Sequence, residues 1–306
     1  MNEGEVVKLL YDCIIVGGGI AGLQAAIQLG RYEHKVLVLD AAEGRSVMCR
    51  SYRNVLGWPE GTDGQVLRRT GKLQAERLGI AFMEKEVEHA FHTEEGFKLS
   101  IKNEQGNHYY SKRLLLATGV KDRIPGFAKL RPCMGKSVFI CPDCDGYEVR
   151  GELAVVIGSG KAGANMAMTL LYWTKELIYI EHEPGEIEDS DLRKLRGNGI
   201  RYIRQQVSQT FVTGVNFTGV ELADGQRIDS DKAFLAFGGN HVRSELAVQL
   251  GAEVAENGHI IVEPRSQKTS VPNLWAAGDV TVHSEQLAIA MGDGSKAAIW
   301  IHKSLL

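Results

Sequence analysis

Cys13-Ile14-Ile15-Val16-Gly17-Gly18-Gly19-Ile20-Ala21-Gly22 is the stretch of the chain that decides its fold. An apolar run typical of a buried strand leads directly into three glycines at GxGxxG spacing, and a helical pattern follows over residues 23–30. A second strand-like run, residues 36–40, ends in Asp40. In such a unit the glycines let the backbone approach a pyrophosphate at the helix N-terminus, and the acid accepts hydrogen bonds from a ribose. The pattern predicts a dinucleotide-binding unit.

The same pattern occurs a second time along the chain. An apolar run over 153–157 leads into Gly158-Ser159-Gly160-Lys161-Ala162-Gly163, a helical pattern covers 164–173, and the strand-like run 177–181 ends in Glu181. The acid follows the first glycine at the same separation in both copies. A single GxGxxG is a weak signal, but chance repetition of the whole pattern is not expected. The sequence therefore predicts an α/β fold with two Rossmann-like, doubly wound, three-layer domains.

The second unit is predicted to be inserted into the first. A buried strand over 114–116 ends in Thr118-Gly119, and the run 231–236 ends in the same way at Gly238-Gly239. Beyond this point a strand-like return over 258–262, the motif 271–279 and an apolar-periodic helix over 285–304 complete the chain. We predict one domain from residues 1–119 and 241–306, and an inserted domain from residues 120–240.

Cys141-Pro142-Asp143-Cys144, followed by Asp145-Gly146, lies between the two glycine motifs. Two cysteines separated by two residues can close and reopen a disulfide, and the thiolate pKa in such motifs often falls from ~8.5 to about 7. The thiolate then exchanges with another disulfide through a mixed disulfide. Half of a zinc site is the other interpretation, but the further ligands would be as distant as Cys133 and His182. A redox-active pair without a metal is therefore favoured.

Composition limits the classes of function. A chain of 306 residues is long enough for two domains, and its 44% hydrophobic and 24% charged content is that of a globular protein. A net charge of −3 favours neither nucleic acid nor an anionic membrane as partner. Met1 to Leu9 carries acids and no long apolar run, which does not fit a signal peptide. Five cysteines with one CxxC suit a reducing compartment, so a cytoplasmic location is expected.

The motifs in this order resemble the low-molecular-weight thioredoxin reductase family and its relatives among the flavin-dependent dithiol oxidases. The likeness covers nearly the whole chain and includes Ala117-Thr118-Gly119, Cys141-Pro142-Asp143-Cys144-Asp145-Gly146 and Ala277-Gly278-Asp279. The resemblance implies an FAD-dependent disulfide oxidoreductase in which the flavin and the Cys141/Cys144 pair exchange two electrons with an external dithiol or disulfide. It also implies a homodimer and, as substrate, a thioredoxin-like protein or a small dithiol or disulfide.

The resemblance further implies roles for individual residues. Cys144 would face the flavin, Cys141 would attack the external substrate, and Asp145 would carry the proton; a turn or N-cap role is the alternative for Asp145. The FAD in the first domain would be held by glycines, acids and polar side chains, namely Gly17, Gly19, Gly22, Asp40, Asn54, Thr118, Gly119, Gly278, Asp279 and Gln286.

The sequence departs from the family after the second strand of the second unit. Thioredoxin reductases carry arginines there for the 2′-phosphate of NADPH, whereas this chain has Glu181-His182-Glu183. A carboxylate ~5 Å from a phosphate costs on the order of 3 kcal/mol at an effective dielectric of roughly 20, so NADPH is disfavoured.

Three electron partners remain open at this point. NADH would be bound through Gly158, Gly160, Gly163 and, at its ribose, Glu181. A ferredoxin could take the place of a nicotinamide. Oxygen is the third, as in the dithiol oxidases. The remaining interpretation of Glu181 is a solvated acid at the end of a strand, on a dinucleotide site no longer used.

Overall fold

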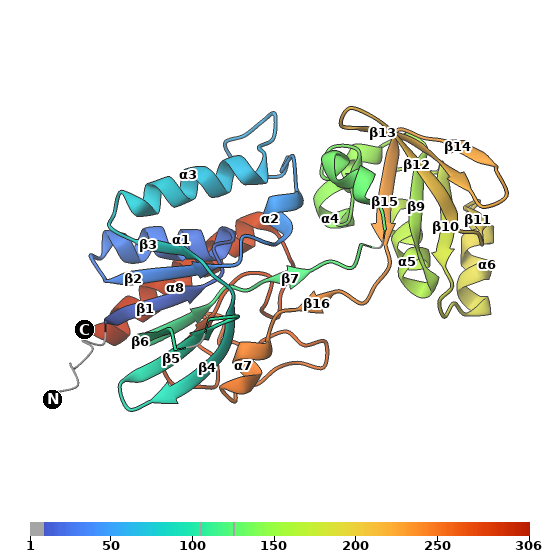
Figure 1. Ribbon diagram of the computed structural model, residues 1–306. Helices are drawn as coiled ribbons and strands as arrows, with labels where there is room; N and C mark the ends of the chain where they lie inside the picture. Colours follow the sequence, from blue (N-terminus) through green and yellow to red (C-terminus); the bar gives the residue numbers. More distant parts are fainter. Residues whose placement is uncertain (1–8, 105, 125) are drawn as a thin grey trace, which may run out of the picture. The chain divides into compact units, whose positions relative to one another are not determined.

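The computed structural model describes residues 9–104, 106–124 and 126–306, so the sequence expectation for Met1 to Leu9 lies, apart from Leu9, outside the described residues. By its internal contacts the chain divides into two compact units, whose elements are labelled in Figure 1. Unit 1 comprises Gln65–Lys121, His241–Leu306 and the described part of Met1–Val47, and unit 2 comprises Met48–Gly64 and Asp122–Asn240.

The main sheet of unit 1 has the strand order β3-β2-β1-β6-β5-β4 (Figure 1). Strand β17 is also paired to β6. Strands β3, β2, β1, β6 and β17 run parallel, and β5 and β4 continue from β6 as an antiparallel meander. The strands are β1 (Leu10–Val16), β2 (Val36–Asp40), β3 (Ala81–Glu84), β4 (Val87–Thr93), β5 (Gly96–Ile101), β6 (His108–Leu116) and β17 (Leu274–Ala276).

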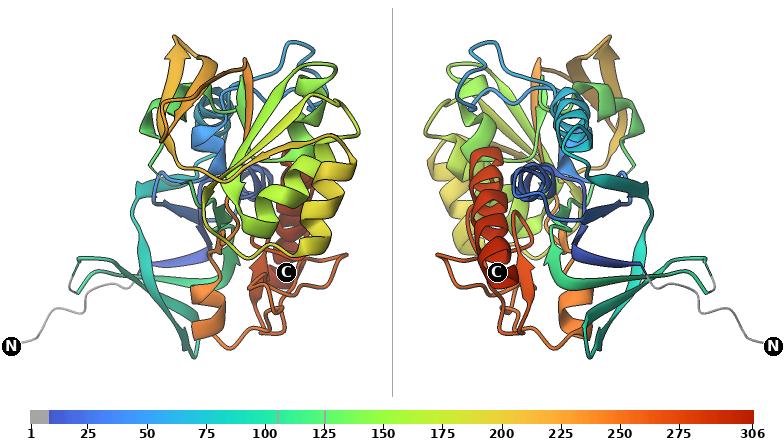
Figure 2. Two further views of the ribbon diagram at one scale, coloured as in Figure 1. Left: turned by 90° about the vertical axis from the view of Figure 1, so that its right-hand side faces the viewer. Right: turned by 90° about the vertical axis from the view of Figure 1, so that its left-hand side faces the viewer.

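Strand β1 lies in the middle of this sheet and is covered on both faces. Cys13 and Ile15 belong to a core formed with helices α1 (Ile20–Arg31) and α8 (Leu287–Leu305), which lie side by side (Figure 2). Ile14 and Val16 belong to the core on the other face, where α7 (Glu245–Gln249) also packs. Burial on both faces explains why this strand is a continuous apolar run rather than an alternating one.

Unit 2 repeats this arrangement. Its parallel sheet has the order β11-β10-β9-β15-β8, so that β9, β10, β11 and β15 correspond to β1, β2, β3 and β6. Its strands are β8 (Val138–Phe139), β9 (Ala154–Ser159), β10 (Leu177–Glu183), β11 (Arg201–Ile203) and β15 (Lys232–Ala236), with the separate sheet β12 (Val207–Thr213), β13 (Asn216–Leu222) and β14 (Arg227–Asp229). The predicted α/β fold with two Rossmann-like units is confirmed.

The helices of the two units follow the same plan. Each glycine-rich turn opens a helix, α1 in unit 1 and α5 (Gly160–Leu170) in unit 2, and a second helix precedes the third strand, α3 (Gly64–Glu76) and α6 (Asp189–Gly197). Shorter helices are α2 (Arg45–Met48) and the 3₁₀ helices η1 (Ala128–Cys133) and η2 (Gly146–Val149). No helix in the described part of the chain combines the length and the apolar character needed to cross a membrane.

The chain leaves unit 1 at β7 (Val120–Lys121) and re-enters it at β16 (His241–Val242), and these two strands pair antiparallel. Two details differ from the sequence expectations. The segment 258–262 forms only isolated bridges at Ile260, because it follows a turn and pairs with single residues on either side. Residues 48–64, which the predicted boundaries assign to the first domain, fall by their contacts in unit 2.

Two histidines join the ends of α1 and α8. His34 Nε2 and His302 Nδ1 lie 2.9 Å apart, and the ring of Tyr32 stacks on that of His302 with centroids 4.0 Å apart. Burial lowers the pKa of His34, Asp12 opposes this, and His302 and Lys112 lower the pKa further. The neutral form of His34 is therefore the one that the fold favours.

We expect unit 1 to lose stability in mild acid through this pair. Because the pKa of His34 is lower in the folded than in the unfolded chain, its contribution is complete above ~6.5 and is lost as pH falls through the lowered pKa. One hydrogen bond corresponds to about 1 kcal/mol of unfolding free energy. Urea unfolding at a series of pH values should show this loss in the natural protein and a flatter profile in His34→Gln; parallel profiles would contradict the assignment.

Candidate active site and dinucleotide-binding turns

The first glycine-rich turn joins β1 to α1, and its three glycines differ in how much space lies beside them. Gly17 has a φ of +106°, and a Cβ at this position would overlap the carbonyl of Ala117. A Cβ at Gly22 would overlap the carbonyl oxygen of Gly17. At Gly19, by contrast, no atom of the described residues other than the glycine and its two chain neighbours lies within 4 Å of the position that a Cβ would take. Packing thus explains two of the glycines, and the third leaves space for a ligand at the helix N-terminus.

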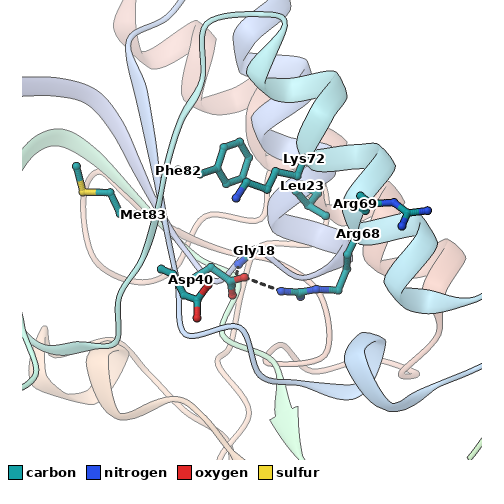
Figure 3. Close-up of a pocket in the computed structure, with 9 residues that line it drawn as sticks. Gly18, Leu23, Asp40, Arg68, Arg69, Lys72, Phe82 and Met83 are labelled. Carbon is teal, nitrogen blue, oxygen red and sulfur yellow. Dashed lines mark hydrogen bonds and ion pairs between the residues drawn. The ribbon is translucent and has the colours of Figure 1, made fainter. Parts of the chain in front are cut away.

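A cavity of about 230 Å³ lies beside this turn (Figure 3). Asp40 reaches into it from the end of β2, accepting hydrogen bonds from the Gly18 N–H at 3.0 Å and from Arg68 at 2.6 Å. The lining combines acids, several cations and an aromatic ring: Gly18, Leu23, Asp40, Arg68, Arg69, Lys72, Phe82, Met83 and Glu84. A carboxylate for a ribose diol and cations for phosphates are the groups that the adenosine diphosphate half of FAD requires.

The other residues expected to hold FAD in unit 1 lie at chain turns. Gly278, with a φ of +79°, lies against Ala21 of α1, so any side chain there would crowd the helix. Asp279 follows it and pairs with Arg45 at 3.2 Å; burial raises the pKa of Asp279, and Arg45 opposes that rise. Gln286 is the N-cap residue of α8. No sequence motif marks Arg45, which also pairs with Glu285.

Thr118 and Gly119 have a visible structural role. The Thr118 hydroxyl donates to the carbonyl of Arg243 at 2.5 Å, and the Gly119 carbonyl accepts the Arg243 N–H at 3.0 Å. Both bonds fasten the returning chain to the end of β6. Asn54 lies in the segment 48–64 and hence, by its contacts, in unit 2, whereas the other residues expected to hold FAD belong to unit 1.

Cys141 and Cys144 form a disulfide at the start of α4 (Pro142–Asp145). Cys141 is the N-cap residue, and its sulfur accepts a hydrogen bond from the Cys144 N–H at 3.2 Å. When the disulfide opens, this N–H stabilises a thiolate on Cys141. Within residues 9–104, 106–124 and 126–306, no group of three or more His, Cys, Asp or Glu is arranged to hold a metal ion.

Asp145 lies directly beside the cysteine pair. Its backbone N–H donates to the Cys141 carbonyl at 3.1 Å. Burial raises the pKa of the Asp145 carboxyl to about 7; Arg53 opposes this rise and Glu148 adds to it. A carboxyl with a pKa near neutrality can both accept and release a proton at cellular pH, as a general acid–base group must.

The segment 48–64 supplies one of these charged neighbours. Arg53 donates to the Gly135 carbonyl at 3.0 Å and lies 3.4 Å from the Glu148 carboxylate. The Arg50 N–H donates to the Met134 carbonyl at 2.9 Å, which holds the segment on unit 2. The sequence does not predict that Arg53 lies near Asp145, because the two residues are far apart along the chain, whereas Glu148 follows Asp145 by three residues.

The second glycine-rich turn has the same plan and different surroundings. A Cβ at Gly158 would overlap the carbonyl of Ala236, and one at Gly163 would overlap the ring of Tyr179. Gly160 has a φ of +44° and lies against residues 185–186. All three glycines are therefore accounted for by contacts within the protein.

Glu181 is fully buried, so the interpretation as a solvated strand-end acid is wrong. Its carboxylate accepts hydrogen bonds from the Gly185 N–H at 3.2 Å and the Tyr202 hydroxyl at 2.5 Å, and pairs with Arg204 at 3.2 Å. Glu183 pairs with Arg123. Each of these carboxylates thus has a cation beside it, which reduces the repulsion of a phosphate that the sequence alone predicts.

Comparison with known proteins agrees with this architecture. Residues 11–294 match the family model described as pyridine nucleotide-disulphide oxidoreductase. One component of the alkyl hydroperoxide reductase of Xanthomonas campestris pv. phaseoli is 30% identical over 95% of this chain and 56% of its own length. The chain therefore spans little more than half of that relative. Thioredoxin reductase from Mycolicibacterium smegmatis is 29% identical over 95% of this chain and 96% of its own.

A solved structure shows the same likeness in three dimensions. The oxidoreductase from Agrobacterium tumefaciens superposes with a TM-score of 0.78 at 29% identity, over 97% of this chain and 99% of that one. Because the family model extends over most of its length, the chain belongs to the pyridine nucleotide-disulphide oxidoreductase family.

Proposed function

We propose that this protein is an FAD-dependent, thioredoxin reductase-like disulfide oxidoreductase that uses Cys141 and Cys144. The observation that carries the proposal is the disulfide of this pair beside Asp145, whose carboxyl has a pKa raised to about 7. The match to thioredoxin reductases over nearly their whole length supports it. In this proposal residues 1–119 and 241–306 form the FAD-binding domain and residues 120–240 the inserted domain.

Apart from Asn54, which belongs to unit 2, the residues proposed to hold FAD belong to unit 1. Gly17, Gly19 and Gly22 would accept the pyrophosphate at the N-terminus of α1, and Asp40 the adenosine ribose. The remaining residues of this set are Asn54, Thr118, Gly119, Gly278, Asp279 and Gln286. When bound, FAD supplies a carrier for two electrons and is the source or the destination of those that pass through the cysteine pair.

The proposed sulfur chemistry is thiol–disulfide exchange. A thiolate of an external dithiol attacks the sulfur of Cys141, the Cys141–Cys144 bond breaks, and Cys144 leaves as a thiolate. The second thiol of the substrate then displaces Cys141 from the mixed disulfide, so the substrate is oxidised and the pair reduced by two electrons. Asp145 holds the proton released in this sequence, and the Cys144 N–H stabilises negative charge on Cys141. Reduction of an external disulfide is the same sequence reversed.

We further propose that NADPH is not the working reductant, because Glu181 and Glu183 stand where the related reductases have arginines and already engage Arg204 and Arg123. NADH, a ferredoxin or oxygen would then complete the cycle, with a thioredoxin-like protein or a small dithiol as the sulfur substrate. The odd number of cysteines supports a reducing, cytoplasmic compartment. We also propose that the protein is a homodimer and that neither nucleic acid nor a membrane is its partner.

Anaerobic titration tests the proposed function. In FAD-loaded protein, a small dithiol should bleach the visible flavin band with a stoichiometry of two electrons, and readmission of air should restore it if oxygen is the acceptor. Cys141→Ser and Cys144→Ser should each abolish bleaching by dithiol while the protein still binds FAD. A colourless protein that does not take up FAD, or full activity in the serine variants, would refute the proposal.

The pH dependence of this reduction should report Asp145. We expect an apparent pKa near 7 that disappears in Asp145→Asn, with a rate lower by about 100-fold. Arg53→Gln should move the apparent pKa upward, because the guanidinium lowers the pKa of Asp145, and Glu148→Gln should move it downward. Stopped-flow rates of flavin bleaching between about pH 5 and 9 provide the measurement. An unchanged profile in Asp145→Asn would assign the proton transfer to another group.

A further inference from the structure

The duplicated fold offers an internal comparison of two glycine-rich turns. In unit 1 the place of a Cβ at Gly19 is free of neighbours within 4 Å. In unit 2 the equivalent position is Gly160, and a Cβ there would overlap the Glu186 carbonyl and approach the Glu186 N to 2.9 Å. The same motif is thus open in one unit and filled by the protein's own chain in the other.

The filling segment is 184–187, which follows β10. The Glu186 carbonyl accepts the Lys161 N–H at 2.7 Å, in the first turn of α5. A Cβ on Gly185 would lie 2.8 Å from the Gly160 N and 2.6 Å from the Ser159 hydroxyl. Backbone N–H groups at this position are the donors that a dinucleotide pyrophosphate requires. A peptide carbonyl therefore occupies the place of a phosphate oxygen.

The 184–187 segment is anchored at both ends. At its start, the Gly185 N–H donates to Glu181, which is buried and also held by Tyr202 and Arg204. At its end, Ile187 packs against the core of unit 2 that contains Leu195 and Tyr179. These contacts distinguish the segment from a loop lying loosely over a site.

The charges near the turn are also matched within the protein. Arg204 pairs with Glu181, Arg123 with Glu183, and Lys161 with Glu188 at 3.4 Å. Each of these three cations lies beside a carboxylate of the chain. A dinucleotide would have to displace a carboxylate to engage any of them.

We propose that the 184–187 segment is a built-in plug of the second dinucleotide site, so that neither NADH nor NADPH binds to unit 2 of the folded enzyme. The inference deepens the proposed function and rests on it, because it removes nicotinamide from the list of electron partners. Glu181 is then a structural anchor of the plug rather than a ribose ligand. Electrons enter and leave through the cysteine pair and a partner of the flavin other than a nicotinamide.

Calorimetric titration of the FAD-saturated natural protein with NADH and NADPH is the direct test, since the first site is then filled. We expect no saturable binding up to about 1 mM, the upper end of usual Michaelis constants. Hydrogen exchange should show a slow Lys161 amide, unchanged by either nucleotide, because its N–H is bonded to Glu186. Saturable binding with a change at the Lys161 amide, or a fast-exchanging Lys161 amide without ligand, would overturn the proposal.

A plug exchange gives the converse test. Residues 184–187 are exchanged for Gly-Gly, which shortens the segment by two residues and withdraws the carbonyl that accepts the Lys161 N–H. This variant should bind NADH at least about tenfold more tightly than the natural protein. Glu188→Gln, which removes the negative charge of the surface ion pair to Lys161 and keeps an oxygen for Ser190, is the matched control and should gain no binding. A folded exchange variant that still fails to bind would overturn the plug as the cause; if the variant does not fold, the measurements on the natural protein decide.

Reduction by dithiol in the same preparations separates the two proposals. If NADH bleaches the flavin, the plug is refuted while the proposed oxidoreductase remains. If neither nucleotide binds and a dithiol also leaves the flavin oxidised, the plug is supported and the proposed function is refuted.

Discussion

The first backbone N–H groups of a helix have no partner within the helix, and this constraint shapes each site of the molecule. At α1 the glycine-rich turn leaves them accessible beside a cavity lined by Asp40 and cations. At α4 the sulfur of Cys141 accepts one of them. At α5 the carbonyl of Glu186 does so. The N-terminus of α1 thus borders a cavity, whereas N–H groups of α4 and α5 donate to the Cys141 sulfur and to the Glu186 carbonyl, respectively.

Two acids of unit 2, Asp145 and Glu181, differ in their burial and in the groups that surround their carboxylates. Asp145 loses hydration beside the disulfide and has only the partial compensation of Arg53, so its pKa rises to about 7. Glu181 is more deeply buried, but a hydroxyl, a backbone N–H and a guanidinium surround its carboxylate. The two acids of this unit therefore have different roles: in the proposed function Asp145 exchanges a proton, whereas Glu181 holds the segment 184–187.

Much of the fold can be read from the sequence, since strand periodicity and glycine spacing are local properties. The strand-like run 36–40 forms β2 with the bounds that its apolar pattern predicts. The motif predicts that Gly17, Gly19 and Gly22 border a pyrophosphate, whereas the close packing of Gly17 on Ala117 and of Gly22 on Gly17 is visible only in the structure. The strand expected at 258–262 is absent as a regular element, because its partners are single residues.

The surroundings of the sites could not be predicted in the same way. Tyr202 and Arg204 meet Glu181 only through the pairing of β10 with β11, and no motif announces a hydroxyl or guanidinium at that place. The carbonyl of Glu186 is a backbone group, which any residue would supply, so its position leaves no mark on the sequence. The attachment of 48–64 to unit 2 also depends on backbone bonds, such as that from Arg50 to Met134.

The parallel pairing of β17 with β6 and the packing of α8 on α1 have a consequence for biosynthesis. Leu274–Ala276 and Leu287–Leu305 leave the ribosome only after every residue of unit 2 has been made. Until then the apolar face formed by Cys13, Ile15 and α1 lacks the helix that covers it. Unit 2, which is continuous apart from 48–64, can therefore fold before unit 1 is complete. Until α8 has been synthesised, the apolar face of unit 1 that α8 covers remains exposed and can be bound by chaperones.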